Sequence, residues 1–252
     1  MGVSNTIQYN PDMVGYWGVE WEMFLLNSEG QYSPKAYDFL QNAKNYYGHE
    51  RWTYELSACQ VECRTEPSAD LSALEFDLRE AKKQATHIGR IIGCKTVGIE
   101  VADDTLSSDV YDDDERYRKL AKTIPQDRLR AACSVANVQV HIGCRDIHHA
   151  IEVNNKLVPH LEFLSDIGDN SNGNRLKLYK QMAKNWHPQI YRDPEHFDKV
   201  AESQGFDQDL RNCWHMVRIS RHGTVELRMF GNSDSVNHIL CWVKVVDWLL
   251  KH

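Results

Sequence analysis

The sequence predicts an α+β fold, in which helices cover one face of a mostly antiparallel sheet and the other face lines a cavity. Two observations indicate this class. Several short segments alternate strictly between apolar and polar residues, as half-buried strands do. Three longer segments carry an apolar stripe at helical spacing. The order of the elements would also fit parallel βαβ units, but strands buried on both faces read as continuous apolar runs, so the alternation favours antiparallel pairing.

The first predicted strand runs from Gly15 to Leu26 and carries two carboxylates in an aromatic setting. Glu20 and Glu22 point to the same face, roughly 7 Å apart at their attachment points, because strand side chains alternate with period two. Ionised carboxylates among aromatic residues are costly unless a cation lies between them. This pair therefore indicates a metal site. The opposite, apolar face comprises Trp17, Val19, Trp21, Met23 and Leu25.

Further segments show the same alternation, with polar residues near the middle of one face. Residues 59–66 and 135–144 are predicted strands, and residues 214–220 and 224–230 are predicted to form a hairpin. We expect all their polar faces to meet on the inner side of the sheet. This polar set comprises Gln60, Glu62, Arg64, Gln139, His141, Glu226 and Arg228, with Glu55 in the turn or strand edge before Gln60.

Three helices are predicted between and after the strands. The first has Ser68 as its N-cap and Asp70 in its first turn. The second is capped by Asp146 and is expected to kink or divide at Pro159. The third runs from about Ser235 to the end of the sequence.

Composition and charge exclude several classes of protein. The 252 residues are 42% hydrophobic and 26% charged, as in soluble globular proteins. The net charge of −7 and the lack of a basic stripe argue against a nucleic-acid partner. Seven cysteines without a CxxC pair, and no signal-like or 18-residue apolar run, favour a cytoplasmic protein without a membrane partner. We expect one catalytic domain over residues 1–252, with an acidic loop at residues 102–116.

The polar face combines metal-binding and phosphate-binding side chains. Five carboxylates and one imidazole suit Mg²⁺ or Mn²⁺ better than zinc. Two carboxylates about 4 Å apart repel by roughly 4 kcal/mol at an effective dielectric constant of 20, which divalent ions would relieve. Arginines such as Arg64 and Arg228 suit phosphate oxygens. Metal ions and arginines in a polar cavity are typical of phosphoryl transfer.

Four short motifs resemble the metal-binding strands of the carboxylate–amine ligase superfamily. This superfamily includes glutamine synthetase, type 2 glutamate–cysteine ligase and a set of shorter amidoligases, and the segment after the last motif is most similar to the amidoligases. The motifs occur in the family's order. They are Gly18-Val-Glu-Trp-Glu22, Gln60-Val-Glu-Cys-Arg-Thr65, Gln139-Val-His-Ile-Gly143 and Gly223-Thr-Val-Glu-Leu-Arg228.

The resemblance implies a funnel-shaped sheet with two or three divalent ions at its waist, where ATP and the acid enter from opposite ends. It implies an acyl phosphate that an amine attacks, with small-molecule or peptide substrates, and a homo-oligomer is compatible with it. The implied ligands are Glu22, Glu55 and Glu62 for one ion and Glu20, His141 and Glu226 for another. The implied catalytic residues are Arg228, Arg64 and Arg175, and the implied nucleotide-binding residues are Arg228, Gln139 and Gln60.

Some features depart from the family or leave alternatives open. The polar stretch 168–174 replaces an aromatic, proline-containing segment of longer relatives, which leaves open whether glutamate and cysteine are the substrates. Arg175 is expected either to bind a substrate carboxylate or to start a surface helix. No glycine-rich phosphate loop is present. A metal-dependent amide or ester hydrolase and a non-catalytic ATP-binding relative are the alternative functions. Six histidines without ligand spacing are expected at the surface or in packing: His148, His149, His187, His196, His215 and His222.

Overall fold

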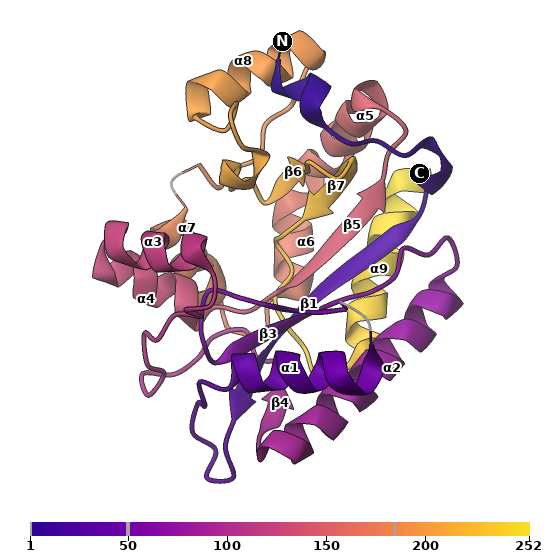
Figure 1. Ribbon diagram of the computed structural model, residues 1–252. Coiled ribbons are helices and arrows are strands. Elements are labelled where there is room, and N and C mark those ends of the chain that lie inside the picture. The colour runs from indigo at the N-terminus through magenta and orange to yellow at the C-terminus, as the bar shows by residue number, and fades with distance from the viewer. Residues whose placement is uncertain (1, 49–50, 184) are drawn as a thin grey trace.

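The computed structural model describes residues 2–48, 51–183 and 185–252. Within these residues an antiparallel sheet of seven strands runs through the centre of the molecule (Figure 1). Its strand order is β2-β3-β1-β5-β7-β6, and β4 pairs with β1 as well. The expected α+β class with antiparallel strands is confirmed. The strands are β1 Trp17–Leu26, β2 Trp52–Tyr54, β3 Gln60–Arg64, β4 Lys95–Val97, β5 Val138–Gly143, β6 Val217–Ile219 and β7 Thr224–Leu227.

The long strand β1 organises the sheet, because it pairs with β3, β5 and β4. Figure 1 shows β1 and β5 running side by side across the molecule. The hairpin of β6 and β7 continues the sheet beyond β5. This register brings the polar residues of neighbouring strands to the same level. It pairs Glu22 with Glu62, Glu20 with Gln139, and His141 with Glu226.

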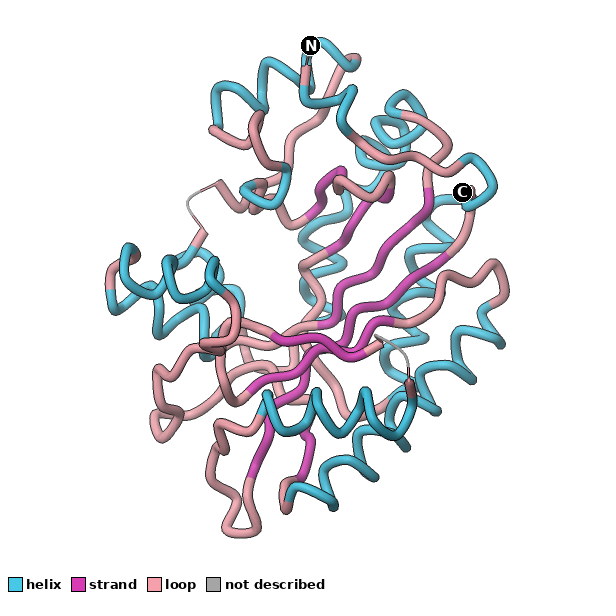
Figure 2. Tube along the Cα trace, in the orientation of Figure 1, coloured by secondary structure: helices cyan, strands magenta, loops and turns pink. Residues whose placement is uncertain are grey.

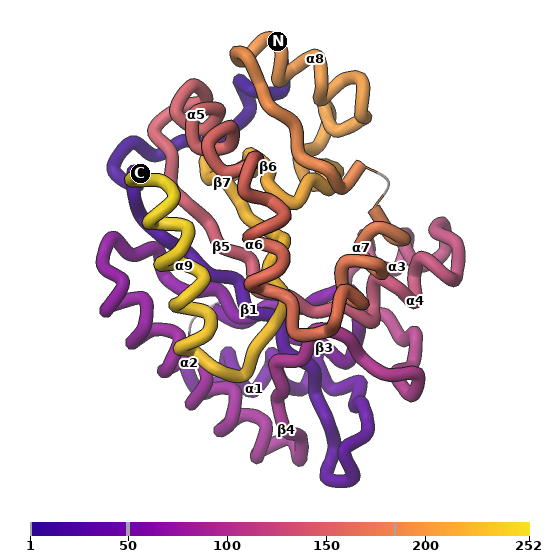
Figure 3. The backbone as a smooth tube through the Cα atoms, turned by 180° about the vertical axis from the view of Figure 1, so that it is seen from behind, coloured from indigo at the N-terminus to yellow at the C-terminus, as the bar shows by residue number. Residues whose placement is uncertain are grey.

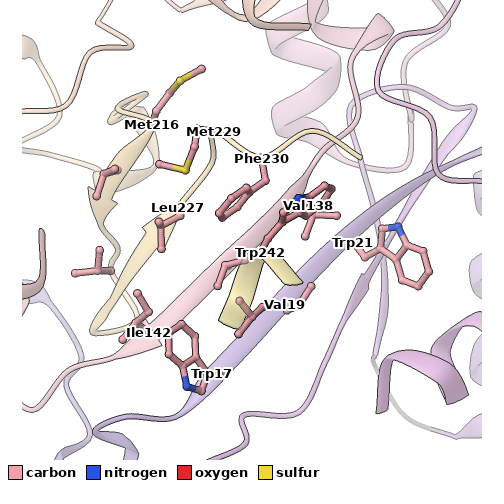
Figure 4. Packing of buried hydrophobic residues seen from close by; sticks show 14 of the residues in the cluster. Trp17, Val19, Trp21, Val138, Ile142, Met216, Leu227, Met229, Phe230 and Trp242 are labelled. Atoms are coloured by element: carbon pink, nitrogen blue, oxygen red, sulfur yellow. The ribbon is translucent and has the colours of Figure 1, made fainter. Parts of the chain in front are cut away.

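The apolar face of the sheet forms the main core. Trp17, Val19 and Trp21 of β1 lie there with Val138 of β5 and Leu227 of β7 (Figure 4). Helices cover this face, and in the view from behind α9 crosses in front of β1 and β5 (Figure 3). The predicted division of each strand into an apolar and a polar face is therefore confirmed. The helices that belong to this layer are α1 Ala36–Tyr47, α2 Leu71–Ile92, α5 Ile147–Leu157, α6 Leu161–Gly168 and α9 Val236–Lys251.

Helix α2 begins later than the sequence predicts. Its N-cap is Asp70, whose carboxylate accepts a hydrogen bond from the amide of Ser72. Ser68, the predicted cap, instead exchanges two backbone hydrogen bonds with Trp17. The prediction of Ser68 as the cap is wrong because this residue pairs with Trp17 at the start of β1, and the helix begins only after that pairing ends.

The other two helix predictions are confirmed. Asp146 caps α5 and Ser235 caps α9, each accepting a hydrogen bond from a backbone amide in the first turn. Pro159 lies in a short 3-10 helix, Val158–His160, which divides α5 from α6. A proline cannot donate the backbone hydrogen bond of a continuous helix, and the chain breaks there.

Several helices have no counterpart in the sequence prediction. Three of them, α3, α4 and α7, stand together beyond the polar face of the sheet, on the left of Figure 1. The acidic loop ends at Asp114, which caps α3, so Glu115 and Arg116 belong to that helix. The helices without a counterpart are α1, α3 Glu115–Thr123, α4 Gln126–Ser134, α7 Asn174–Met182 and α8 Pro194–Gln204, together with the 3-10 helices Val3–Thr6, Pro11–Met13 and Leu210–Asn212.

Loops connect this second layer to the sheet, as the pink segments of Figure 2 show. A smaller apolar cluster joins α4 to the sheet, with Phe24 of β1 packed near Leu129 and Cys133 of α4. Near the start of the chain, the amide of Gln8 donates to the carbonyl of Arg221 at 2.9 Å and braces the β6–β7 turn. Gly223 in this turn has a φ of +72°, which other residues rarely adopt. In the described part of the chain, we find no helix with the length and apolar character needed to span a bilayer.

Candidate active site

The polar face of the sheet lines a cavity of about 450 Å³. The strands form one side of it, and residues of α3, α4, α7 and the β6–β7 turn form the remaining walls. Ten of the residues selected from the sequence lie here together. They are Glu20, Glu22, Glu55, Gln60, Glu62, Arg64, Gln139, His141, Glu226 and Arg228.

Three carboxylates form a first potential ligand group. Glu22, Glu55 and Glu62 each present an oxygen, and these oxygens lie within 4.8 Å of one another. Two oxygens on opposite sides of a Mg²⁺ ion lie about 4.2 Å apart, so the group can close on an ion with small movements. Glu22 is oriented by the backbone amide of Asn137 at 2.7 Å and by the Gln139 amide at 3.0 Å.

Burial and mutual repulsion raise the pKa values of the carboxyl groups in this first group. Burial, and then the charge of Glu62, raise the pKa of Glu22 to about 8. Burial and the charge of Glu22 raise the pKa of Glu55 to about 7. Burial and the charge of Glu20 hold the pKa of Glu62 well above its usual value. Without an ion the group retains protons near neutral pH, and a divalent cation fits the same three oxygens without them.

A second potential ligand group contains Glu20, His141 and Glu226, whose ligand atoms also lie within 4.8 Å of one another. Nδ1 of His141 lies 2.9 Å from the hydroxyl of Thr224. Nε2 is buried without a hydrogen-bond partner among the described residues, 3.6 Å from a Glu20 oxygen. With Nδ1 bound to the hydroxyl, Nε2 is left free toward the carboxylates, as in metal-binding histidines.

The second group is balanced by nearby positive charges. Burial would raise the pKa of Glu20, but the charge of His141 holds it below its usual value. Burial would lower the pKa of His141, but the charge of Glu20 raises it. In Glu226, burial is outweighed by the charges of Arg218 and Arg228, which hold the pKa far below its usual value. The two groups therefore differ, since the first retains protons and the second is ionised.

Arg228 connects the two groups. Its Nη1 donates to Glu226 at 2.5 Å and to the side-chain oxygen of Gln139 at 2.9 Å. The amide nitrogen of Gln139 in turn donates to Glu22 of the first group. Arg218 donates to the other oxygen of Glu226 at 2.7 Å. Two guanidinium groups thus reach the cavity beside the second ligand group, where they can bind an anion.

Arg64 and Gln60 lie at the edge of this arrangement. Arg64 donates to Glu62 at 2.8 Å and lies 3.5 Å from Glu20, while its side chain is 55% exposed. Gln60 is buried and its amide donates to the carbonyl of Val135 at 2.7 Å. The amides of both predicted glutamines are thus engaged by protein groups.

Arg175 occupies neither of the positions considered for it in the sequence. It lies in the first turn of α7, but the residue is 3% exposed and is not part of the cavity wall. Its guanidinium donates to the backbone carbonyls of Arg228, at 3.4 Å, and Met229. Because α7 turns this residue toward the end of β7, Arg175 contacts the backbone of the site.

Other cavity residues were not selected from the sequence. They come from the second helical layer and from turns, where no strand alternation marks an inward side chain. His222, expected at the surface or in packing, lies in the β6–β7 turn at the cavity. His222 directly precedes Gly223, the first residue of the last motif, and this position could have marked it as a cavity residue. The additional residues include Arg116, Tyr117, Arg128, Tyr179, Trp214, Arg218, Arg221 and His222.

Residues 16–251 match the protein family described as glutamate-cysteine ligase family 2. The chain belongs to this family. The glutamate–cysteine ligase of Natronomonas pharaonis is 24% identical over 257 residues, which cover 95% of this chain and 70% of that protein. Membership of family 2 confirms the resemblance to the carboxylate–amine ligase superfamily, a group of ATP-dependent ligases.

Two solved structures share the fold of this family 2 chain. A bifunctional glutathione synthetase from Pasteurella multocida has a TM-score of 0.65 at 11% identity, over 95% of this chain. GmaS, solved without ligand, has a TM-score of 0.51 at 13% identity, over 93% of this chain. This chain spans 38% and 54% of those two chains, respectively. At these identities the likeness concerns the fold alone.

Proposed function

We propose that this family 2 chain is an ATP-dependent ligase that joins a carboxylate to an amine through an acyl phosphate. The observation that carries the proposal is the pair of ligand groups on one cavity wall, connected by Arg228. Glu22, Glu55 and Glu62 would hold one divalent ion, and Glu20, His141 and Glu226 a second. We also propose that the sheet forms a funnel whose two ends admit ATP and the acid.

The side chains of the cavity divide the work of phosphoryl transfer. Bound Mg²⁺ or Mn²⁺ would neutralise and orient the phosphate oxygens of ATP. Arg228 is positioned to donate hydrogen bonds to the transferred phosphoryl group, where negative charge develops. Arg64, which is half exposed beside Glu20, can turn toward an incoming anion. Gln139 orients Glu22 and Arg228 at once, so it links metal binding to phosphoryl binding.

The proposed reaction has two steps. A carboxylate oxygen of the acid attacks the γ-phosphorus of ATP, and ADP leaves. The amine nitrogen then attacks the acyl carbon, phosphate leaves with the oxygen that came from the acid, and the nitrogen releases a proton. The name of the Natronomonas relative makes glutamate and cysteine the first substrates to test, among small-molecule and peptide acids and amines.

Isotope transfer tests this proposal. Glutamate with labelled carboxylate oxygens is incubated with cysteine, ATP and Mg²⁺, and the products are analysed by mass spectrometry. We expect ADP only when the acid is present, and one labelled oxygen in each phosphate. Glu226→Gln should abolish both products, whereas Glu195→Gln, at a side chain that is 78% exposed on α8, should not. ADP formation with unlabelled phosphate would contradict the acyl phosphate.

The same assay separates the two alternative functions. A hydrolase would cleave an amide or ester without ATP, using the carboxylates to activate water. A non-catalytic relative would bind ATP without releasing ADP over a wide panel of acids and amines. One catalytic domain over residues 1–252, a cytoplasmic location and a homo-oligomer stay predictions from the sequence.

A further inference from the structure

Helix α7 contacts Arg228 at its side chain. The Nε group of Arg228 donates to the hydroxyl of Tyr179 at 3.3 Å, and that hydroxyl donates to the carbonyl of Trp214 at 2.8 Å. Tyr179 is 1% exposed, so its ring is fixed by packing. The hydroxyl therefore ties the guanidinium of Arg228 to the backbone just before β6.

The same helix contacts the backbone on which Arg228 stands. Arg175 precedes Tyr179 by four residues, so the two side chains leave α7 on the same face. Both Nη atoms of Arg175 donate to the carbonyl of Arg228 at 3.4 Å, and Nη2 also donates to the carbonyl of Met229. Among the described residues Arg175 has no ion pair, although the charge of the buried Glu100 acts on its guanidinium. A buried charge satisfied by carbonyl groups is costly to keep, which points to a specific use of this residue.

These contacts lie just beyond the end of strand β7, where the hydrogen bonds of the ladder stop. Strand β7 ends at Leu227, so Arg228 is outside its ladder and keeps one backbone hydrogen bond, from its amide to Met216 at 2.7 Å. The next backbone hydrogen bond to the sheet comes at Gly231, whose carbonyl accepts from the amide of Val138 at 2.8 Å, and α7 helps to fix the stretch between these two points. The helix is itself anchored to α4, because Arg128 donates to the carbonyl of Met182 and Gln181 donates to that of Asp127.

We propose that Tyr179 and Arg175 are positioning residues that aim Arg228 at the reacting phosphoryl group, an inference that rests on the proposed ligase function. Tyr179 fixes the rotation of the guanidinium, and Arg175 fixes the backbone carbonyls beneath it. Together they direct Nη1 into the space between Glu226 and Gln139. Arg228 makes the contact with substrate, and the two α7 residues act through it. A misplacement of about 1 Å can lower a rate about a hundredfold, so such a support has a measurable effect.

The crystal structure of the Tyr179→Phe variant tests this inference without any substrate. Phenylalanine keeps the buried ring, so folding should be preserved, and it removes the hydroxyl that accepts from Nε of Arg228. We expect the guanidinium to leave its hydrogen bond with Gln139. If Arg228 keeps its contacts with both Gln139 and Glu226 in the variant, the inference is overturned.

A double-mutant cycle tests the same inference in catalysis. We expect Tyr179→Phe to lower kcat about tenfold in the ligase assay, with the KM for ATP changed less than about twofold. In an Arg228→Lys background the same substitution should have no further effect, because Tyr179 acts through Arg228. Equal losses in both backgrounds would show an independent role and overturn the inference. Tyr37→Phe, at a half-exposed side chain on α1, is the matched control and should leave kcat unchanged.

Arg175 is tested by comparing two substitutions. Arg175→Met removes all donors to the carbonyls of Arg228 and Met229, whereas Arg175→Lys retains one charged donor. We expect the lysine variant to recover part of the kcat that the methionine variant loses, again without a change in KM for ATP. Equal kcat in both variants overturns the role of Arg175. If the wild-type chain forms no ADP, the proposed function fails, and the crystal structure of Tyr179→Phe still shows whether Tyr179 positions the guanidinium of Arg228.

Discussion

Glu22 and Glu62 lie directly opposite each other in the antiparallel ladder of β1 and β3, and both are buried. Like charges in this position destabilise a sheet, normally by up to about 1 kcal/mol, and burial increases the cost. The register that creates this pair also pairs His141 with Glu226 on the neighbouring strands. The sheet therefore concentrates charge in a way that a bound cation would relieve.

This relationship predicts opposite effects of one substitution with and without metal. Glu62→Gln removes one of the two facing carboxyl groups, so we expect the metal-free protein to become more stable by about 1 kcal/mol at an alkaline pH at which both groups ionise. In Mn²⁺ the variant should lose its advantage, because the first ligand group is broken. Urea unfolding in chelator and in Mn²⁺ measures both free energies, with Glu195→Gln as the exposed control. A variant that is less stable than wild type in chelator would contradict the account.

The raised pKa values predict a pH dependence of stability. Folded Glu22, with a pKa of about 8, and folded Glu55, with a pKa of about 7, retain protons that the unfolded chain has already released. Between about pH 5 and pH 8 the folded state binds more protons, so the free energy of unfolding should fall as the pH rises. The raised pKa of His141 acts in the same direction.

Divalent ions should remove this dependence, because they replace the protons of the first group. The lowered pKa values of Glu20 and Glu226 add stability that is lost only in acid, below about pH 4.5. Urea unfolding from about pH 5 to pH 8, with chelator or with Mg²⁺, measures the effect. Metal-free stability that rises over this interval would show that the first group is ionised without metal.

The hydroxyl of Thr224 is predicted to orient His141 for metal binding. Thr224→Val removes the partner of Nδ1 and keeps a β-branched residue in β7. Loss of a hydrogen bond that orients a metal-binding histidine typically lowers metal affinity about 10- to 100-fold. We therefore expect weaker Mn²⁺ binding at the second ligand group and unchanged binding at the first. Calorimetric titration of Mn²⁺ measures both sites. Thr96→Val in β4, outside the cavity wall, is the control, and two unchanged affinities in Thr224→Val would refute the role.

Asn232 is predicted to stabilise both the core and the first ligand group. Its side chain accepts from the indole of Trp21 at 3.1 Å and donates to the backbone carbonyl of Glu22 at 2.7 Å. Asn232→Ala leaves two buried groups unpaired, which should cost about 2 to 4 kcal/mol of the free energy of unfolding. Chemical denaturation measures this against Asn237→Ala, an exposed position on α9. A loss no larger than that of the control would contradict the role.

The sheet could be predicted from the sequence because its two faces differ in polarity. In β1 the alternation separates Trp21 from Glu20 and Glu22, and the structure follows that pattern. The motifs also predicted that Glu62, His141 and Glu226 lie on other strands of the same sheet, facing the same cavity. The start of α2 was misplaced because Ser68 has a distant partner, Trp17, that local capping rules do not include.

The second helical layer could not be predicted in the same way. Helix α3 has only nine residues and none of them is buried; Tyr117, Leu120 and Ala121 pack partly buried against the smaller apolar cluster, so the position of the helix depends on contacts with distant segments. The inward turn of Arg175 depends on Arg228, which lies 53 positions later in the chain. No local pattern distinguishes such a residue from an arginine at the surface start of a helix.

The central claim is that the two ligand groups hold divalent ions beside a nucleotide. Anomalous diffraction from crystals soaked with Mn²⁺ and a non-hydrolysable ATP analogue tests it most directly. We predict one anomalous peak among Glu22, Glu55 and Glu62, and a second among Glu20, His141 and Glu226, with the γ-phosphate analogue next to Arg228. A bound nucleotide with no Mn²⁺ peak at either group would contradict the account.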